Sequence, residues 1–186
     1  MENFILLNIV NDKIDEKILS QVMDYKKEFI ENNVELNGVS GLGRVDNIDD
    51  WIEINKKRQS ITTCPKDHVP SSEYLFVRKN DSKLLGMINI RYSLIFFGHI
   101  GYSIRPTEHN KGYGTIMLKL ALEKCRNELK EKLINDPTYE EFRVMVTCDK
   151  ENIGSRRVIE KNNGKLLEEV YHENHECIVQ RFWIYL

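Results

Sequence analysis

The chain lacks the long apolar run that a membrane-spanning helix requires. No stretch of its 186 residues approaches the ~18 to 20 consecutive apolar residues that cross a bilayer. Residues 1–10 include Glu2 and Asn8 and carry no basic region, so they do not read as a signal peptide. These absences favour a cytoplasmic protein, and we expect no membrane partner.

A strong charge of either sign is also missing. The 27 basic and 29 acidic residues leave a formal net charge of −2. Domains that bind nucleic acids usually carry a clear basic excess, because they must neutralise phosphates. We therefore expect no nucleic-acid partner. The 41% of hydrophobic and 30% of charged residues are typical of a soluble globular protein.

Closely spaced cysteines are absent too. The chain has four cysteines and no C-x-x-C pair, whereas disulfide frameworks and zinc sites normally show paired spacing. We expect four reduced thiols, most of them buried as small apolar side chains, and no metal site. A reducing cytoplasm fits this usage. The four are Cys64, Cys125, Cys148 and Cys177.

Repeats, low-complexity segments and linkers are likewise lacking, and the length suits one domain over residues 1–186. Apolar spacing and turn residues define the expected elements. The first part predicts a strand at 4–10, a helix at 14–30, a loop at 32–46, a helix at 48–57 capped by Asn47, and a loop at 60–72. The rest predicts a hairpin of strands 74–78 and 84–92, a strand at 98–104, a helix at 112–133, a strand at 142–148, a helix at 152–162, and strands at 165–169 and 178–186. This order indicates an α/β domain with a mixed sheet.

The most informative segment runs from Gly98 to Thr115. It reads as a strand that stops at Pro106, a short polar turn, and a helix entered through the glycines at 112 and 114. Such an entry presents free backbone N–H groups at the positive end of the helix dipole, which suits a phosphate or pyrophosphate. Glycine lets phosphate oxygens approach the amides, and Lys111 adds a positive charge. The alternative is that the glycines serve only a tight helix entry.

Two segments together resemble the GCN5-related N-acetyltransferase (GNAT) family. The run His109-Asn110-Lys111-Gly112-Tyr113-Gly114, after Ile104-Arg105-Pro106, is similar to its motif A, (Arg/Gln)-x-x-Gly-x-(Gly/Ala). Asn152-x-x-Ser155, followed by Ile159-Glu160-Lys161 and Gly164, resembles its Asn-x-x-(Ala/Ser)…Tyr-x-Lys-x-Gly segment. A bacterial subgroup of predicted acetyltransferases also shares Val69-Pro70-Ser71, Gly86 to Arg91, Gly98 to Pro106 and Arg181-Phe182-Trp183-Ile184. The resemblance covers nearly everything from Tyr74 onward.

The resemblance implies a GNAT fold, with a mostly antiparallel mixed sheet of about seven strands, a central splayed parallel pair and flanking helices. It implies an acetyltransferase that moves the acetyl group of acetyl-CoA to a primary amine of a small molecule or peptide by direct attack, as a monomer or homodimer. The pantetheine arm would lie between the splayed strands, and the turn at 109–115 would take the pyrophosphate. The implied cofactor-binding residues are Tyr102, Ile104, His109, Asn110, Lys111, Gly112, Tyr113, Gly114, Thr115, Asn152 and Ser155.

The chain departs from the family at two positions. His109 replaces the first Arg or Gln of motif A, but a grip made mostly of backbone should survive. Ile159 stands where many relatives carry a tyrosine that acts as general acid. A leaving thiolate, with a pKa of about 8.5, leaves tolerably without an acid. An alkylammonium has a pKa of ~10.4, so deprotonating the amine is the harder problem.

Candidates for proton transfer are Tyr102 and His99. Their odd separation places them on opposite faces of the strand, His99 with Ser103 and Tyr102 with Ile104. A strand histidine can equally be structural. The other candidates are Tyr92, where the subgroup tends to carry His, and Asp149 and Glu151, which suit solvated partners of the helix dipole.

The Glu-rich first helix and the 37–46 loop are expected to cover the acceptor site, where acidic residues would favour a cationic amine. Plain surface charge is the alternative for these residues, which are Glu16, Asp24, Glu28 and Glu31. Two other functions compete. One is a non-catalytic acyl-CoA-binding module, which Ile159 and Tyr92 favour. The other, a dinucleotide-binding Rossmann enzyme, fits poorly because the glycine turn lies late in the chain, lacks the third glycine, and has no acidic residue at the required place at the end of the next strand.

Overall fold

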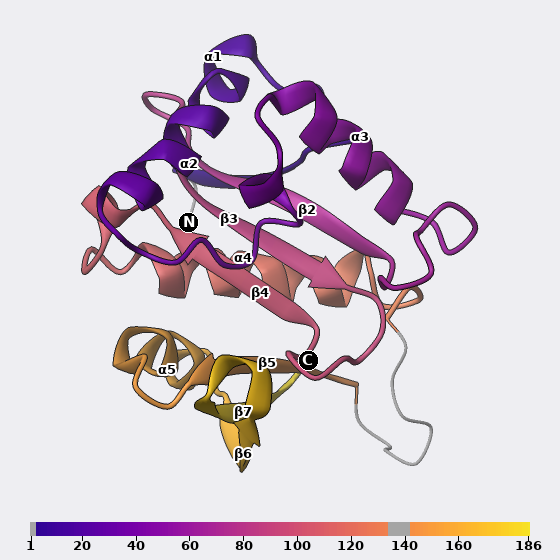
Figure 1. Ribbon diagram of the computed structural model, residues 1–186, viewed down its shortest axis with the longest axis vertical. Coiled ribbons are helices and arrows are strands. Elements are labelled where there is room, and N and C mark those ends of the chain that lie inside the picture. Colours follow the sequence, from indigo (N-terminus) through magenta and orange to yellow (C-terminus); the bar gives the residue numbers. More distant parts are fainter. Residues whose placement is uncertain (1–2, 134–141) are drawn as a thin grey trace.

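A single seven-stranded sheet organises the protein (Figure 1). The computed structural model describes residues 3–133 and 142–186. The strands follow the order β1-β2-β3-β4-β5-β7-β6, and only β4 and β5 run parallel. The predicted mixed sheet with one central parallel pair is thus confirmed. The strands are β1 (Phe4–Asn8), β2 (Ser71–Arg78), β3 (Lys83–Arg91), β4 (Ile100–Ile104), β5 (Arg143–Asp149), β6 (Lys165–His172) and β7 (Cys177–Tyr185).

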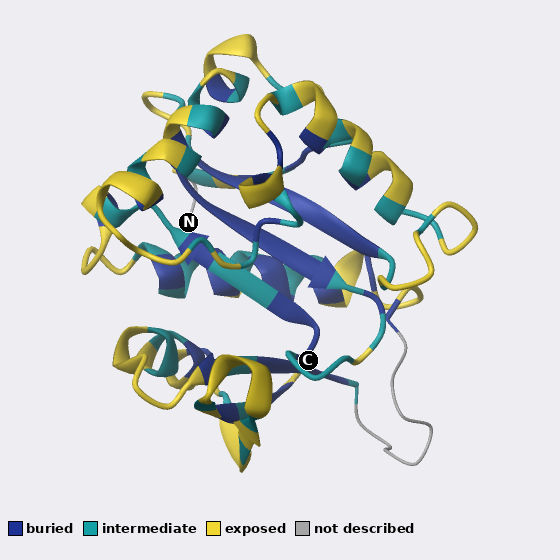
Figure 2. Cartoon of the chain, in the orientation of Figure 1, coloured by how far each residue is buried: buried dark blue, intermediate teal, exposed yellow. Residues whose placement is uncertain are grey.

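Helices cover both faces of this sheet. In Figure 1, α1, α2 and α3 lie in front of the strands and α4 lies behind them. Each face has its own apolar core, one under α1 to α3 and the other under α4 and α5. Figure 2 shows β2 and β3 buried between these layers, while the outer sides of the front helices are exposed. The helices are α1 (Glu16–Leu19), α2 (Gln21–Glu31), α3 (Ile48–Arg58), α4 (Tyr113–Asn127) and α5 (Ile153–Lys161).

The helix predicted at 14–30 is divided into α1 and α2 at Ser20. The Ser20 hydroxyl donates to the Lys17 carbonyl at 3.2 Å, and Gln21 Nε2 donates to the same carbonyl at 2.7 Å. These side chains compete with the backbone for an acceptor that a continuous helix would use. The spacing of Val22, Tyr25 and Phe29 gives α2 one buried face.

The other helices differ from prediction mainly at one end. The Asn47 side chain caps α3 as predicted, accepting from the Asp50 N–H at 2.9 Å. The helix predicted to reach residue 133 ends at Asn127 instead. Leu129 and Leu133 remain buried beyond that end, so their apolar spacing reflects core packing in turns rather than more helix.

β4 and β5 separate almost as soon as they meet. Ile100 and Val146 are their one register pair, whereas β3 pairs with β4 along the whole length of β4. The predicted divergence of the central parallel strands therefore begins just after Ile100. In Figure 1, α5 and the strands β5 to β7 form a group beyond the open side of β4.

Two simpler findings concern the thiols and the membrane. All four cysteines are free; Cys125 and Cys148 are buried, while Cys64 and Cys177 are half-buried. Within residues 3–133 and 142–186, no helix combines the length and apolar character needed to cross a bilayer.

Candidate active site

His99 joins β4 to β5 just before the two strands part. Its backbone N–H donates to the Met145 carbonyl at 2.8 Å, and its Nδ1 accepts from the Met145 N–H at 3.0 Å. The residue is buried, with 1% of its surface exposed. The accepting role of Nδ1 places the proton of a neutral ring on Nε2. His99 therefore holds β4 and β5 together at the point where they begin to diverge.

Beyond this junction, part of the β4 backbone has no strand to pair with. The His99 carbonyl accepts from the Arg91 N–H at 2.7 Å and the Arg105 N–H donates to Leu85, so odd-numbered residues bond to β3. The alternation of an antiparallel ladder turns the main chain of Tyr102 toward β5. Because β5 has already diverged, Tyr102 has no register partner there. Its N–H and C=O can therefore bind a ligand lying between the strands.

The Tyr102 side chain reaches across to α5. Its hydroxyl and the Ser155 Oγ share a hydrogen bond of 2.9 Å. The Ser155 N–H donates to the Asn152 side chain at 2.9 Å, which makes Asn152 the N-cap of α5. Burial raises the pKa of the Tyr102 phenol, so it keeps its proton at neutral pH. The structure thus brings these three predicted site residues together at the divergence.

The turn before α4 has the features of an anion site. Asn110 and Gly112 adopt positive φ angles of 62° and 78°. No side chain caps α4, and its first turn contains no acidic residue. A Cβ built on Gly112 would meet no atom within 4 Å, so the turn faces open space. The first N–H groups of α4 are therefore available to phosphate oxygens.

Gly114 serves a different purpose from Gly112. A Cβ at Gly114 would lie 3.0 Å from the Cγ2 of Val158 and 3.8 Å from the Cγ1 of Ile104. Its missing side chain thus allows α4 to pack against α5 and β4. The missing side chain of Gly114 is therefore accounted for by helix packing, whereas the space beside Gly112 is open.

The polar side chains around the turn form hydrogen bonds and ion pairs with groups in or next to the turn. His109 Nε2 bonds the Ile104 carbonyl at 2.7 Å. Lys111 Nζ donates to Glu108 at 2.9 Å, and Glu108 also pairs with Lys83. The charge of Lys111 is therefore partly balanced before any anion binds.

Two further residues of the predicted set hold neighbouring parts of the structure. The Tyr113 hydroxyl accepts from Arg78 at 3.0 Å, and the Thr115 carbonyl accepts from Asn162 at 3.2 Å. Both contacts leave the backbone N–H groups of these residues pointing along the helix start.

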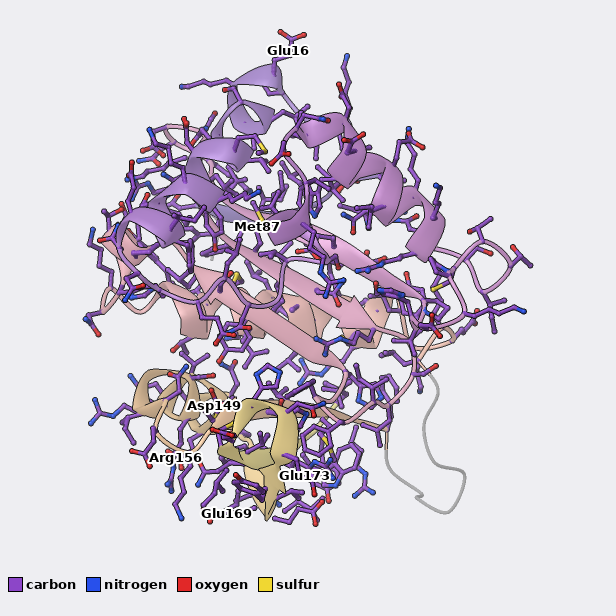
Figure 3. The ribbon with its side chains drawn as sticks, in the orientation of Figure 1. Glu16, Met87, Asp149, Arg156, Glu169 and Glu173 are labelled. Atoms are coloured by element: carbon purple, nitrogen blue, oxygen red, sulfur yellow. The ribbon has the colours of Figure 1, made fainter. Side chains whose placement is uncertain are left out.

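The position of the family's tyrosine, Ile159, and the candidate Tyr92 are both buried. Ile159 is fully buried and packs on Gly164, where a Cβ would come within 2.3 Å of the Ile159 Cγ2. The Tyr92 hydroxyl bonds to Ser72 Oγ at 2.5 Å and is buried. Asp149 is exposed at the end of β5, and Figure 3 places it beside α5, where Arg156 is also labelled.

The opposite face of β4 is covered by the loop after α2. A Cβ on Gly38 would lie 2.1 Å from the Tyr102 nitrogen, so this loop rests directly on the β4 backbone. Of the acidic residues predicted to lie near the acceptor site, Glu28 accepts hydrogen bonds from Arg105 Nη1 and from the Thr107 N–H, each at 2.8 Å. Glu16 is exposed at the far end of α1 (Figure 3).

The sequence pattern does not single out Glu73, which is buried on this same face. The available signal is a carboxylate placed directly before the apolar run of β2, but a strand start tolerates charge, so the signal is weak.

The comparisons with known proteins agree with this geometry. The sequence model of a GNAT acetyltransferase domain matches residues 31–165. The spermidine/spermine N-acetyltransferase SpeG from Vibrio cholerae superposes with a TM-score of 0.64 at 13% identity, over 100% of this chain and 95% of that one. RimL, a ribosomal L7/L12 α-N-protein acetyltransferase bound to coenzyme A, gives 0.65 at 14% identity, over 100% and 96%. A GNAT-family acetyltransferase from Bacillus anthracis gives 0.59 at 18% identity, over 98% and 95%. No curated protein matches the sequence significantly.

Proposed function

The chain belongs to the GNAT family of acetyltransferases, and from this we propose that it transfers the acetyl group of acetyl-CoA to a primary amine. The observation that supports it best is the divergence of β4 and β5 after Ile100, beside an uncapped helix start at Gly112. The first feature offers unpaired backbone to an amide-bearing arm, and the second offers N–H groups to a diphosphate.

The backbone would hold acetyl-CoA along this path. The N–H groups from Gly112 to Thr115 would bind the diphosphate, with Asn110 shaping the turn and Lys111 and His109 flanking it. The main chain of Tyr102 and Ile104 would bind the pantetheine arm on one side, and Asn152 and Ser155 would bind it on the other. Because Tyr102 and Ser155 already bond each other, binding would replace or flank that contact.

The chemistry makes one nitrogen–carbon bond and breaks one carbon–sulfur bond and one nitrogen–hydrogen bond, whose proton passes to solvent. The amine nitrogen bonds to the acetyl carbon, the carbon–sulfur bond breaks, and its electron pair leaves on sulfur. A backbone N–H of β4 would stabilise the charge that develops on the acetyl oxygen. Tyr102 would protonate the leaving sulfur, since Ile159 carries no proton to give. We assign His99 a positioning role, because its contacts with Met145 fix where the strands part.

The acceptor class follows the same reasoning. SpeG is described as a spermidine/spermine acetyltransferase and RimL as an acetyltransferase of a protein α-amino group. Both acceptors are primary amines, so we propose a small polyamine or a peptide N-terminus as acceptor. We propose a cytoplasmic monomer or homodimer that needs neither nucleic acid nor membrane.

A thermal shift assay tests the cofactor site directly. Acetyl-CoA should raise the Tm of the wild-type protein, and Gly112→Glu should abolish that shift by placing a carboxylate where the diphosphate binds. Gly43→Glu is the matched control, because a Cβ there also meets nothing within 4 Å and the residue is not among those proposed to bind acetyl-CoA. If acetyl-CoA leaves the Tm of the wild-type protein unchanged, the proposal is contradicted.

A binding module without catalysis is the second candidate, and the buried Ile159 favours it. An assay of free thiol release, with spermidine and with a peptide bearing a free α-amino group, separates the two. Release of coenzyme A that depends on the amine supports the enzyme, and acetyl-CoA binding without release supports the module.

A further inference from the structure

Arg91 is the last residue of β3 and lies on the sheet face that the loop after α2 covers. Alternate residues of a strand share a face, so its side chain is on the same side as that of Met87. Met87 packs in the core under α1 to α3 and is labelled there in Figure 3. The Arg91 N–H donates to the His99 carbonyl at 2.7 Å. Arg91 therefore stands next to the point where β4 and β5 begin to part.

Backbone carbonyls hold the guanidinium of Arg91 in place. Its Nη1 donates to the Phe97 carbonyl at 3.3 Å and to the Gly98 carbonyl at 2.9 Å. Its Nη2 lies beside Gly101, because a Cβ built on that glycine would be 2.8 Å from this nitrogen. The Cα of Gly38 is 3.3 Å from the same Cβ position, so the loop after α2 borders this place on another side. The guanidinium thus has a defined orientation without a ligand.

One edge of this guanidinium has no partner. Among residues 3–133 and 142–186, nothing accepts a hydrogen bond from Nε or Nη2 of Arg91, and neither atom is completely buried. These two nitrogens form one side of the planar group, and the spacing of their donors matches the two oxygens of a carboxylate. This edge is therefore suited to a carboxylate held by two parallel hydrogen bonds.

The charge of Arg91 also lacks a counter-ion. The arginines that form ion pairs within the described part of the chain are Arg78, Arg105, Arg156 and Arg181. Burial lowers the pKa of Arg91, and the charge of Arg58 on α3 lowers it further. Glu73 opposes this lowering, but burial raises the pKa of its carboxyl group to about 8, so it is mostly protonated at neutral pH. A half-buried guanidinium without a counter-ion favours an anionic ligand.

Gly101 connects this edge with the place where transfer would occur. It is half-buried, and its neighbour Tyr102 presents the unpaired main-chain groups beside which acetyl-CoA is proposed to bind. Neighbouring residues of a strand are about 3.4 Å apart along the strand. In an α-amino acid a single carbon atom separates the carboxylate from the amine. A carboxylate bound by Arg91 would therefore bring such an amine close to Tyr102.

We propose that Arg91 binds a carboxylate of the acceptor and so selects an amine that carries a carboxylate close to it. This inference rests on the proposed acetyl transfer and narrows the class of acceptor. The carboxylate has two possible sources, the α-carboxylate of a free amino acid and the side chain of an acidic residue at a peptide N-terminus. A polyamine offers no anion to Arg91, and its further ammonium groups are repelled by Arg91 and Arg58.

The test measures kcat/KM for two matched pairs of acceptors and for spermidine. One pair is L-alanine and L-alaninamide, and the other is a C-terminally amidated peptide that begins with aspartate and its counterpart that begins with asparagine. The wild-type protein should favour the carboxylate-bearing member of one pair by about 10-fold or more, and that pair identifies the source. Arg91→Gln should raise KM for this member by about 10- to 100-fold and leave the Tm shift by acetyl-CoA unchanged. Arg91→Lys, which keeps the charge but loses the paired donors, should recover only part of the loss.

Two further variants guard against a general loss of structure. Gly101→Ala keeps the arginine but places a Cβ 2.8 Å from its Nη2, so it should displace the guanidinium and reduce the preference within the pair. Arg126→Gln, an exposed arginine near the end of α4, is the matched control and should behave as wild type.

A binding measurement separates this inference from the proposed function. Isothermal titration of the protein saturated with coenzyme A, using the same compounds, measures affinity when no acetyl group is present. If the carboxylate-bearing member binds the wild-type protein and not Arg91→Gln, the carboxylate site stands even where no acceptor is acetylated and the proposed transfer fails.

Three results would overturn this inference. In the first, the wild-type protein acetylates or binds both members of each pair equally, or prefers spermidine to all four, and the proposed transfer survives alone. In the second, none of the four compounds binds. In the third, Arg91→Gln weakens both members of a pair to the same extent, which indicates that Arg91 supports the structure and does not bind the carboxylate.

Discussion

Tyr102 on β4 and Ser155 on α5 meet across the space where the central strands diverge, with 2.9 Å between their side-chain oxygens. They are 53 residues apart in sequence and belong to the two parts of the sheet that β4 and β5 connect. The contact places a protonated phenol close to where the family's α5 tyrosine is replaced by Ile159. Under the proposed transfer, the proton donor for the leaving thiolate would therefore come from β4 instead of α5.

Replacing Tyr102 by Phe should separate that role from packing. We expect kcat to fall about 10-fold. This loss is smaller than the ~10²-fold that general acid catalysis usually contributes, because a thiolate with a pKa of about 8.5 leaves largely without an acid. Loss of one hydrogen bond should lower the unfolding free energy by about 1 kcal/mol. Thiol-release kinetics and urea unfolding measure the two effects. Tyr185→Phe is the control. If Tyr102→Phe leaves kcat unchanged, Tyr102 takes no part in the mechanism.

Gly38→Ala should act on the amine site and leave acetyl-CoA binding intact. The new Cβ would sit 2.1 Å from the Tyr102 nitrogen, at a φ of 68° that alanine tolerates poorly. We expect a loss of about 1 to 3 kcal/mol in unfolding free energy and an altered KM for the amine. Gly43→Ala, where a Cβ meets nothing, is the control. Equal KM values for both variants would contradict a role for this segment.

The two glycines of motif A should respond differently to alanine. Gly112→Ala introduces strain at a φ of 78° in open space and should cost about 1 kcal/mol. Gly114→Ala forces a methyl group against Val158 and should cost about 1 to 3 kcal/mol. Urea unfolding of both variants, with and without acetyl-CoA, gives the comparison. A smaller cost at 114 than at 112 would disagree with the packing observed.

His99→Ala should destabilise the junction of β4 and β5. The substitution leaves the buried Met145 N–H without its acceptor, which costs about 1 to 3 kcal/mol, and opens a cavity besides. Because we assign His99 to positioning, the pH profile of kcat should have the same inflections in the wild-type protein and in His99→Ala. A pH-dependent step near ~6.5 that His99→Ala abolishes would instead make it a participant in proton transfer.

Glu73 should also make stability depend on pH. Its pKa is raised to about 8 by burial, so between about pH 4.3 and 8 the folded state holds a proton that the unfolded state has released. Protons bound preferentially by the folded state make stability fall as pH rises through this range. The Tm of Glu73→Gln should therefore exceed that of the wild type increasingly toward pH 8. Parallel Tm curves for the two proteins would show that Glu73 titrates normally.

Local sequence determined the features that need only neighbouring residues. The glycine turn, the cap of α3 by Asn47 and the cap of α5 by Asn152 each depend on groups within about four residues. The family resemblance in the same segments was sufficient to predict the mixed sheet with its parallel pair. The break at Ser20 was missed, because apolar spacing does not record that Ser20 and Gln21 compete for the Lys17 carbonyl.

Tertiary structure decided everything that depends on partners far along the chain. Ser40 meets Asn89 across 49 residues, and Gly114 is a glycine because of Val158, which no local pattern shows. Glu73 acquires its unusual setting only when β2, β3 and β4 align in register. Backbone preferences and caps are encoded locally, whereas burial and electrostatic surroundings exist only after strands distant in sequence have packed together.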